Sequence, residues 1–413
     1  MTGPLSRRQL LAGSGLATAG VLAAAATGAS VGSILDPAGA DTPGGSTVPF
    51  HGPHQAGVTT PAQARLVFAV YDVTASDPAG LSALLAAWSS AAARLTAGLA
   101  LDGPDGPFAP PPDTGEALDL APSNLTVTVG FGPSLFDGRF GLGPRRSAAL
   151  VDLPAFAGDA LEAARTGGDV CLQVCADDPQ VAFHAVHNLT RVALGSATLR
   201  SLQVGFARTA SDGAGQAAPR NLLGFHDGTN NLVSSDAEAM RRYVWVDQGS
   251  DQPWMAGGTY LVARRIRIHL EAWNDSTLRD QQETIGRIRA TGAPLGATSA
   301  DDPVALGAIY PSGEPVIPDD AHIRVAAPAT NNGAAILRRG YSFADGVDPQ
   351  TGELDAGLFF ICFQKDPGSQ FIPIQRRLSQ TDALAEYLVH TGSGVFACPS
   401  GIGPGEHWGA GLL

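Results

Sequence analysis

Hydrophobic and polar positions follow one pattern twice along this chain. An apolar, strand-like run ends in an acidic residue and a proline at 171–179 (CLQVCADDP) and again at 358–367 (LFFICFQKDP). An amphipathic helical pattern follows each run, over Val181–Leu194 in the first case and Ile374–Leu388 in the second. The repeat predicts two related units, each built from strands and helices.

Earlier strand patterns in the two halves also correspond. RLVFAVY at 65–71 matches YLVARRIRI at 260–268. Strands with helices between them in this order predict an α+β fold, in which two ferredoxin-like units with antiparallel sheets and helices pack together. The units should span 60–212 and 220–413, with the seam in the Gly/Ala-rich stretch at 210–219. Too few strand–helix–strand repeats occur for a barrel, and no GxGxxG follows a strand.

The first 45 residues have the layout of an export signal. The basic pair Arg7–Arg8 precedes a mildly apolar stretch from Leu10 to Ala26, and small residues suited to signal peptidase follow. SRRQLL at 6–11 resembles the twin-arginine consensus. We therefore expect export by the twin-arginine route to the periplasm, the cell envelope or the medium. A retained membrane anchor is the alternative, although the stretch is weakly hydrophobic for a span. Residues 30–62, rich in Gly, Pro and Thr, are predicted to be a cleavage region and linker.

Composition narrows the classes of partner. The 39 acidic and 26 basic residues give a net charge of -13 at pH 7, which disfavours nucleic acid and anionic membranes. A hydrophobic content of 44% is typical of a globular protein with a sizeable core. The spacing of the cysteines does not form a CxxC motif, so we predict buried structural thiols. These cysteines are Cys171, Cys175, Cys362 and Cys398.

The segment NLLGFHDGTNN, at 221–231, places one acid in a turn. Gly224, Gly228 and the asparagine pair favour a turn around Asp227, and the apolar lead-in directs the chain toward the interior. An ordinary Asp-Gly turn would have the same sequence. This segment alone therefore does not decide between a structural and a chemical role.

A second polar cluster lies at 319–343, DDAHIRVAAPATNNGAAILRRGYSF. His322 is followed mostly by apolar residues, so it lies on a partly buried element, where a histidine is ordinarily a core residue. Arg338 follows three apolar positions. A buried arginine needs a partner, because an unpaired charge in a low-dielectric site costs on the order of several kcal/mol. An anionic ligand or a carboxylate such as Asp227 would serve, and so would a purely structural ion pair.

Taken together, these segments resemble the dye-decolourising (DyP-type) peroxidase family, and within it the exported class that includes the periplasmic deferrochelatase/peroxidase. GFHDGTNN at 224–231 is similar to the family's GxxDG motif, DAHIRVAAP at 320–328 to its proximal-histidine segment, and ILRRGYSF at 336–343 to its distal-arginine segment. The resemblance covers nearly all of 60–413. Three further segments extend it, at 257–268, 358–378 and 392–401.

The resemblance implies a peroxidase with one haem b per chain, held in the C-terminal unit. His322 is then the iron ligand, and Asp227 and Arg338 are the distal catalytic pair. The positions that match haem-contacting stretches of the family are Gly228, Thr229, Asn230, Asn231, Ala327, Pro328, Ala329 and Arg338. Ala327 departs from the family pattern, which often has Asn or His before this proline, so no side-chain hydrogen bond is expected there.

These residue types suit peroxide activation. A neutral imidazole gives iron one strong axial donor, and its other ring nitrogen should donate to an acceptor that the sequence does not identify. One carboxylate can take a proton from one peroxide oxygen and return it to the other. An arginine supplies fixed positive charge where negative charge develops. Because an unperturbed carboxylic acid has a pKa of about 4, activity should extend into acid.

The expected reactants are hydrogen peroxide and a small-molecule or dye reductant. Bulky dyes cannot reach a buried haem, so surface aromatic residues are candidates to pass electrons, although packing is the better interpretation for each taken alone. These candidates are Tyr243, Trp245, Trp254, Trp273, Tyr341, Tyr387 and Trp408.

Two other functions stay open. The first is a haem-handling protein that releases iron from the same pocket and works with an iron-uptake system; it would use every residue named above. The second is a haem-free exported binding protein. Retention of Asp227, His322 and Arg338 together argues against the second, because an inactive site has no reason to keep all three. A homodimer is a further expectation.

Overall fold

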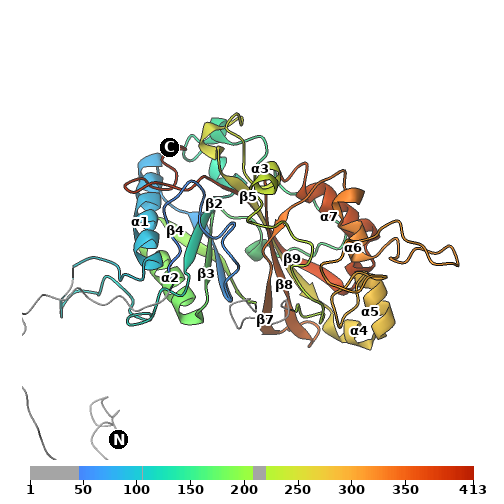
Figure 1. The fold of residues 1–413 in the computed structure, drawn as a ribbon. Helices are drawn as coiled ribbons and strands as arrows, with labels where there is room; N and C mark the ends of the chain where they lie inside the picture. Colours follow the sequence, from blue (N-terminus) through green and yellow to red (C-terminus); the bar gives the residue numbers. More distant parts are fainter. Residues whose placement is uncertain (1–45, 105, 208–219) are drawn as a thin grey trace, which may run out of the picture. The chain divides into compact units, whose positions relative to one another are not determined.

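Two four-stranded antiparallel sheets form the framework of the protein (Figure 1), seen in a computed structural model that describes residues 46–104, 106–207 and 220–413. Short pairings of β2 with β9 and of β4 with β7 join them at their edges into one nine-stranded sheet. The N-terminal sheet has the strand order β2-β3-β1-β4, and the C-terminal sheet has the order β9-β5-β8-β7, with the short β6 also paired to β8. Numbered within its own half, each sheet reads 4-1-3-2, and helices follow its first and third strands. The prediction of two ferredoxin-like units is confirmed.

The elements of the N-terminal half are β1 Arg65–Val73, α1 Pro78–Thr96, β2 Thr126–Phe131, η1 Pro133–Phe136, η2 Gly143–Arg145, η3 Ala163–Arg165, β3 Val170–Ala176, α2 Pro179–Val192 and β4 Ala197–Phe206. Those of the C-terminal half are α3 Ala237–Tyr243, η5 Pro253–Met255, β5 Thr259–Ile268, α4 Leu270–Asp275, α5 Leu278–Ile285, α6 His322–Val325, η6 Pro328–Thr330, β6 Leu337–Arg338, β7 Tyr341–Val347, β8 Leu354–Gln364, α7 Phe371–Thr381, η7 Ala383–Tyr387 and β9 Leu388–Cys398. The predicted export signal and the seam at 210–219 lie outside the described residues.

The helices of the N-terminal half begin where the sequence provides caps. Asp77 and Asp178 each accept hydrogen bonds from backbone N–H groups of the first turn, and each is followed by a proline. Proline suits the first helical position because its missing N–H has no partner there in any case. The predicted helix at 181–194 is thus confirmed as α2, with its start two residues earlier.

The predicted helix at 374–388 was wrong in its bounds. α7 begins at Phe371 and ends at Thr381, and Leu388 already starts β9. Asp382 causes the break, since its side chain accepts a hydrogen bond from the backbone N–H of Leu384 and so caps the short turn η7. The hydrophobic pattern does not mark this change from helix to strand, so it predicted one continuous helix.

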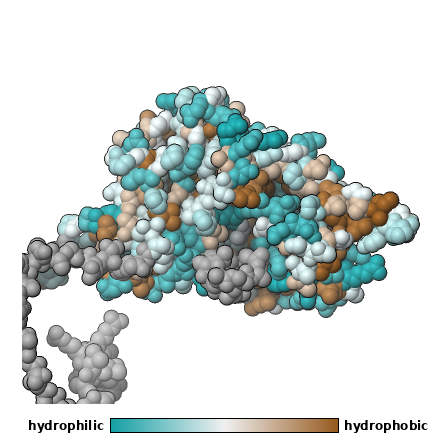
Figure 2. Space-filling model, in the orientation of Figure 1, coloured by the Kyte–Doolittle hydropathy of each residue, from teal (hydrophilic) through white to brown (hydrophobic). Residues whose placement is uncertain are grey.

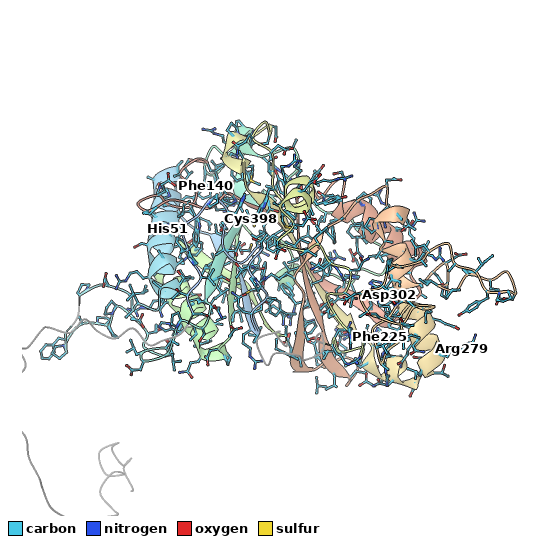
Figure 3. The ribbon with its side chains drawn as sticks, in the orientation of Figure 1. His51, Phe140, Phe225, Arg279, Asp302 and Cys398 are labelled. Carbon is cyan, nitrogen blue, oxygen red and sulfur yellow. The ribbon has the colours of Figure 1, made fainter. Side chains whose placement is uncertain are left out.

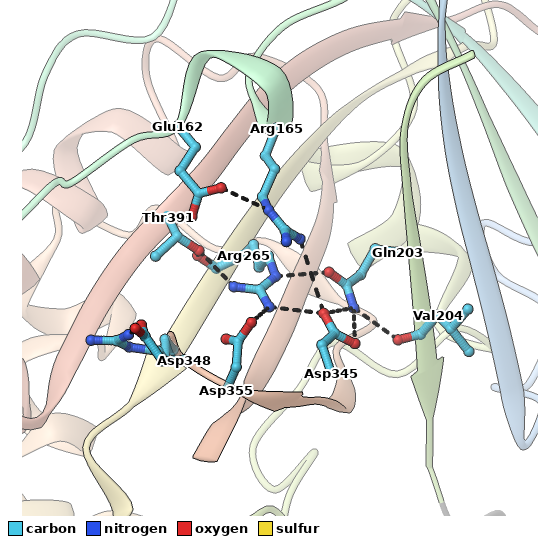
Figure 4. A network of polar contacts seen from close by, with 10 residues as sticks. Glu162, Arg165, Gln203, Val204, Arg265, Asp345, Asp348, Asp355 and Thr391 are labelled. Carbon is cyan, nitrogen blue, oxygen red and sulfur yellow. Dashed lines mark hydrogen bonds and ion pairs between the residues drawn. The ribbon is translucent and has the colours of Figure 1, made fainter. Parts of the chain in front are cut away.

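A polar cluster joins the two sheets (Figure 4). The buried guanidinium of Arg265 on β5 contacts the carboxylates of Asp345 and Asp355 at 2.8 and 2.7 Å, and its Nε donates to Gln203 of β4 at 2.8 Å. It also lies over the ring of Phe343, 4.1 Å from the centroid. Two carboxylates and an aromatic face compensate the burial of one arginine, and Gln203 extends the network into the N-terminal half.

Residues 46–62 are not the free linker that their composition predicted. They lack regular secondary structure, yet Gln55 and Val58 are buried. Gln55 donates to the backbone oxygens of Val129 and Pro399 at 3.0 and 2.9 Å, so it ties together segments of both halves. The side-chain amide of Gln55 thus finds two backbone acceptors in distant segments. These hydrogen bonds explain why a Gly/Pro-rich stretch is held in place.

The surface in Figure 2 is a mixture of hydrophilic and apolar residues, with apolar colour gathered toward the extension drawn in orange in Figure 1. Ile309 and Tyr310, in the segment between α5 and α6, are 67% and 49% exposed. Among the described residues, no helix is long and apolar enough to span a membrane. The four cysteines are buried and free, as predicted.

Candidate active site

His322 opens the one-turn helix α6, which packs against α7. Its Nδ1 lies 2.6 Å from a carboxylate oxygen of Asp382, and the side chain of Asp382 is only 3% exposed. The other carboxylate oxygen accepts the N–H of Leu384. Because a carboxylate can only accept, Nδ1 carries the proton in the neutral ring and Nε2 has the lone pair. The imidazole side chain is 33% exposed, so that lone pair is available to a ligand.

Asp227 lies in a turn fixed by positive backbone angles and buried apolar neighbours. Gly228 has a φ of 73°, and Asn230 has a φ of 56°. Phe225 is buried in a small core with Trp273, whose indole donates to the backbone oxygen of Leu223 at 3.1 Å. Figure 3 shows Phe225 in the C-terminal half, on the side of α4 and α5. One oxygen of Asp227 accepts the N–H of Gly228 at 2.8 Å, which leaves the second oxygen for another partner.

Arg338 is locked to the same turn. The side-chain amide of Asn231 accepts the N–H of Arg338 at 3.0 Å and donates to its carbonyl at 2.8 Å. The guanidinium of Arg338 donates to the backbone oxygen of Thr229 at 2.7 Å. The structure therefore brings 227–231 and β6 together as predicted. It does not pair Arg338 directly with Asp227, however, because none of the ion pairs among the described residues joins the two.

Basic residues adjoin this turn, and none of the ion pairs among the described residues includes Arg220 or Arg287. Arg287 is buried; it donates to the backbone oxygen of Gly292 at 2.7 Å, while its Nε has no partner among the described residues. Burial lowers the pKa of Arg287, and the charge of Arg338 lowers it further. Burial and then the charges of Arg220 and Arg287 lower the pKa of His226, whose buried Nε2 also has no described partner. Carboxylate groups of a bound ligand would satisfy these donors.

The strand β8 presents an incompletely covered apolar face toward the helices. Leu358 and Phe360 are half-buried, although β8 is paired on both of its edges. The same face holds Cys362, which pairs with Arg338 across β6 and β8. The ring of Phe360 lies 6.3 Å from that of Phe371 on α7, which places this face under α7. An apolar face on one side and an imidazole on α6 fit a flat, largely apolar cofactor with acidic groups, which is what haem is.

The other predicted contacts lie in loops beside these groups. Gly228 and Asn230 are exposed, and Thr229 uses its carbonyl for Arg338. Ala327 is buried at the start of η6, and Pro328 and Ala329 are exposed. The carbonyl of Ala327 accepts the amide of Asn331 at 2.8 Å, so the main chain is held here although the side chain offers no hydrogen bond.

Sequence reasoning missed Asp382, His226 and Arg287. Asp382 stands sixty residues after His322, in a stretch read as continuous helix, and no periodicity marks it. His226 adjoins Asp227 in the motif itself and could have been named from that position. Arg287 follows α5 and looks like an ordinary basic residue at a helix end.

The surface aromatic candidates separate into two groups. Trp254, Trp273, Tyr341 and Trp408 are buried core residues. Half-buried candidates at the surface are Tyr243, Trp245 and Tyr387.

Comparison with known proteins shows the family to which the chain is similar. Residues 55–207 match the family model described as Dyp-type peroxidase, N-terminal, and residues 218–403 match Dyp-type peroxidase, C-terminal. A deferrochelatase of Escherichia coli K12 is 40% identical over 371 residues, covering 88% of this chain and 87% of that protein. The structure of DtpA from Streptomyces lividans, an oxyferrous complex, is 41% identical with a TM-score of 0.83, covering 90% of this chain and 99% of that one. A DyP-type peroxidase from Streptomyces coelicolor gives 41% identity and a TM-score of 0.84, over 90% and 98% of the two chains.

Proposed function

Because the chain belongs to the Dyp-type peroxidase family, an enzyme family with haem as cofactor, we propose that it is a haem b peroxidase in which His322 ligates iron and Asp227 and Arg338 act on hydrogen peroxide. The contact between Nδ1 of His322 and the buried carboxylate of Asp382 carries this proposal. This contact fixes the orientation of the imidazole ring and selects its tautomer. The lone pair of Nε2 is then free to bind iron.

On the side of the iron ligand, Asp382 makes the His322 imidazole a stronger electron-pair donor to iron. A carboxylate that accepts the Nδ1 proton pushes electron density toward Nε2 and raises ligand basicity. The cap to Leu384 holds the carboxylate in place, so the ring orientation is set before any ligand binds. Bound haem would supply the redox-active iron that reacts with peroxide.

On the distal side, Asp227 takes a proton from one peroxide oxygen and returns it to the other. The N–H of Gly228 holds one carboxylate oxygen, and the second is free to act as the base. Arg338 provides positive charge beside the oxygens during this transfer. Asn231 holds the main chain of Arg338 and Thr229 holds its guanidinium by hydrogen bonds. The positive charge is therefore already in position before the proton is transferred.

The cofactor's acidic groups would be held by the uncompensated donors of His226 and Arg287. Leu358 and Phe360 would pack against the flat face of the ring, and the segment of Ala327, Pro328 and Ala329 would border it on the proximal side. This arrangement buries the cofactor in the C-terminal half.

The test is an absorbance spectrum of the haem-loaded protein before and after one equivalent of hydrogen peroxide. Wild type should show a Soret band that shifts promptly. Asp227→Ala and Arg338→Leu should keep the band and slow the shift about 100- to 1000-fold in stopped flow. Asp236→Ala, which removes a carboxylate that only caps α3, is the control and should react at the wild-type rate. A wild-type band unmoved by peroxide would refute the peroxidase function.

A second function is favoured by the likeness to deferrochelatase, namely release of iron from haem in the same pocket. Haem incubated with the protein and a ferrous chelator would then lose iron without added peroxide. Release at the rate of free haem would remove this candidate. If the protein releases iron in this way, we propose that an iron-uptake system receives the iron.

We further propose export by the twin-arginine route, supported by SRRQLL at 6–11 and the apolar stretch after it. Replacing both arginines with lysine should keep the protein in the cytoplasm. A homodimer stays a prediction, which analytical ultracentrifugation checks.

A further inference from the structure

A groove of about 400 Å³ lies on the surface of the C-terminal half, separate from the residues assigned to peroxide activation. It is bordered by the end of α3, by residues 331–334 after η6, and by the turn from β8 into α7. We call it the α3–α7 groove; the residues that carry the argument are Arg242, Tyr243, Asn331, Lys365, Asp366 and Gln370. Its volume falls within the range of pockets for small ligands.

The guanidinium of Arg242, in the α3–α7 groove, has no carboxylate partner among the described residues. Lys365 is paired with Asp247 at 2.6 Å. Asp366 is engaged by its own turn, where it accepts the N–H of Gly368 at 2.7 Å and the hydroxyl of Ser369 at 2.8 Å. Arg242 takes part in none of the ion pairs among the described residues. Its guanidinium lies over the ring of Tyr243, 5.0 Å from the centroid. An exposed cation next to an aromatic face suits an anionic aromatic molecule.

The floor of the groove is fixed and is tied to both sides of the proposed active site. Gln370 donates to the backbone oxygens of Tyr243 and Ala335 at 2.9 and 2.5 Å. Asn331 donates to the backbone oxygens of Val325 and Ala327 at 2.8 Å each. Ala335 lies three residues before Arg338, and Val325 lies three residues after His322. The groove is therefore linked by hydrogen bonds to main chain that lies close in sequence to both His322 and Arg338.

We propose that the α3–α7 groove binds the reductant, as an aromatic anion whose charged group pairs with Arg242 and whose ring lies against Tyr243. This proposal rests on the proposed peroxidase function. Two reductant molecules each lose one electron and one proton, and together these reduce one hydrogen peroxide to two waters. The groove accounts for the oxidation of molecules that are too bulky to reach an enclosed cofactor.

The test compares two phenols with the same ring, vanillate and its uncharged methyl ester, in steady-state turnover by the haem-loaded enzyme. Arg242→Glu should raise KM for vanillate about tenfold and leave KM for the ester and kcat unchanged. Arg241→Glu makes the same change of charge on the neighbouring residue, which does not line the groove. This control should leave both KM values near wild type. Titration calorimetry of vanillate against the resting enzyme should show the same weakening in Arg242→Glu only.

An equal rise in KM for Arg241→Glu would overturn the proposal, since a general surface field would then explain the effect. Unchanged KM in both variants would also overturn it and direct attention to the residues around His322. Failure of the peroxidase function itself is distinguishable, because it would appear as a wild-type Soret band that peroxide does not move.

Discussion

The two halves of the molecule share one strand order but use the space between sheet and helices differently. In the N-terminal half, α1 and α2 close over the sheet; Trp88 is fully buried and donates to the backbone oxygen of Leu189 at 2.7 Å. In the C-terminal half, α6 and α7 face a sheet whose Leu358 and Phe360 stay half-buried, and the side chain of His322 is 33% exposed. The N-terminal copy is closed by fully buried side chains, whereas side chains below α6 and α7 in the C-terminal copy stay partly exposed.

The difference agrees with the proposed cofactor site, in which bound haem would take the place of a hydrophobic core. A ferredoxin-like unit must bury one face of its sheet. In the N-terminal half, the indole of Trp88 and several leucines cover that face. In the C-terminal half a flat apolar group with acidic edges would complete the same layer, which explains why Arg287 and His226 have polar atoms without described partners there. Stability and function should therefore respond to substitutions in opposite ways in the two halves.

The largest expected effects separate the halves directly. Trp88→Ala removes a buried indole and should lower the free energy of unfolding by about 3–5 kcal/mol, with the Soret spectrum of the folded protein unchanged. His322→Ala should abolish or grossly alter the Soret band, since the axial donor is lost, while the far-ultraviolet circular dichroism stays native. Denaturant titration and absorbance spectra on both variants check this.

A Soret change in Trp88→Ala, or a native Soret band in His322→Ala, would break the comparison. The first result would show that the N-terminal core shapes the cofactor site. The second would exclude His322 as the iron ligand.

The next effect concerns two capping aspartates, one in each half. Asp382→Asn keeps an acceptor for the N–H of Leu384 but loses the charge next to Nδ1 of His322. The imidazole then becomes a weaker donor, so the haem potential should rise and the peroxide reaction should slow about 10- to 100-fold. Potentiometric titration and stopped flow measure the two changes.

Asp178→Asn is the matched control, because Asp178 caps α2 in the N-terminal half and touches no histidine. It should leave the potential and the rate unchanged. Equal effects of the two substitutions would assign Asp382 a structural role only.

Much of this arrangement could be predicted from the sequence. The repeated strand–proline–helix pattern led to both units, and the motifs around Asp227 and Arg338 led to two segments that the structure brings together. Asp382 could not be predicted, because its partner is sixty residues away and only the break between α7 and η7 aims its carboxylate at the ring. The packing of 46–62 was hidden for a similar reason. Gln55 is held by backbone groups of distant segments, and composition does not encode such contacts.

The smallest expected effect lies where the halves meet. His390 on β9 is buried, 4.0 Å from Asp159, which belongs to a loop of the N-terminal half. Burial lowers the pKa of His390 to about 4, and the charge of Arg264 acts in the same direction while Asp159 opposes it. In the unfolded chain the pKa of a histidine is about 6.5. The unfolded state therefore takes up the proton first as pH falls, so this residue costs the folded state stability between about pH 6.5 and pH 4.

The loss should amount to roughly 1 kcal/mol near pH 5.5. His390→Gln removes the titrating group, so the free energy of unfolding of the variant should fall less than that of wild type between pH 7 and pH 5.5. His51→Gln, at an exposed histidine of the N-terminal segment, should follow the wild-type profile. Denaturant titrations at several pH values check this. Parallel profiles for wild type and His390→Gln would mean that the junction between the halves opens enough to admit the proton, and the halves would then be less firmly joined than the cluster around Arg265 indicates.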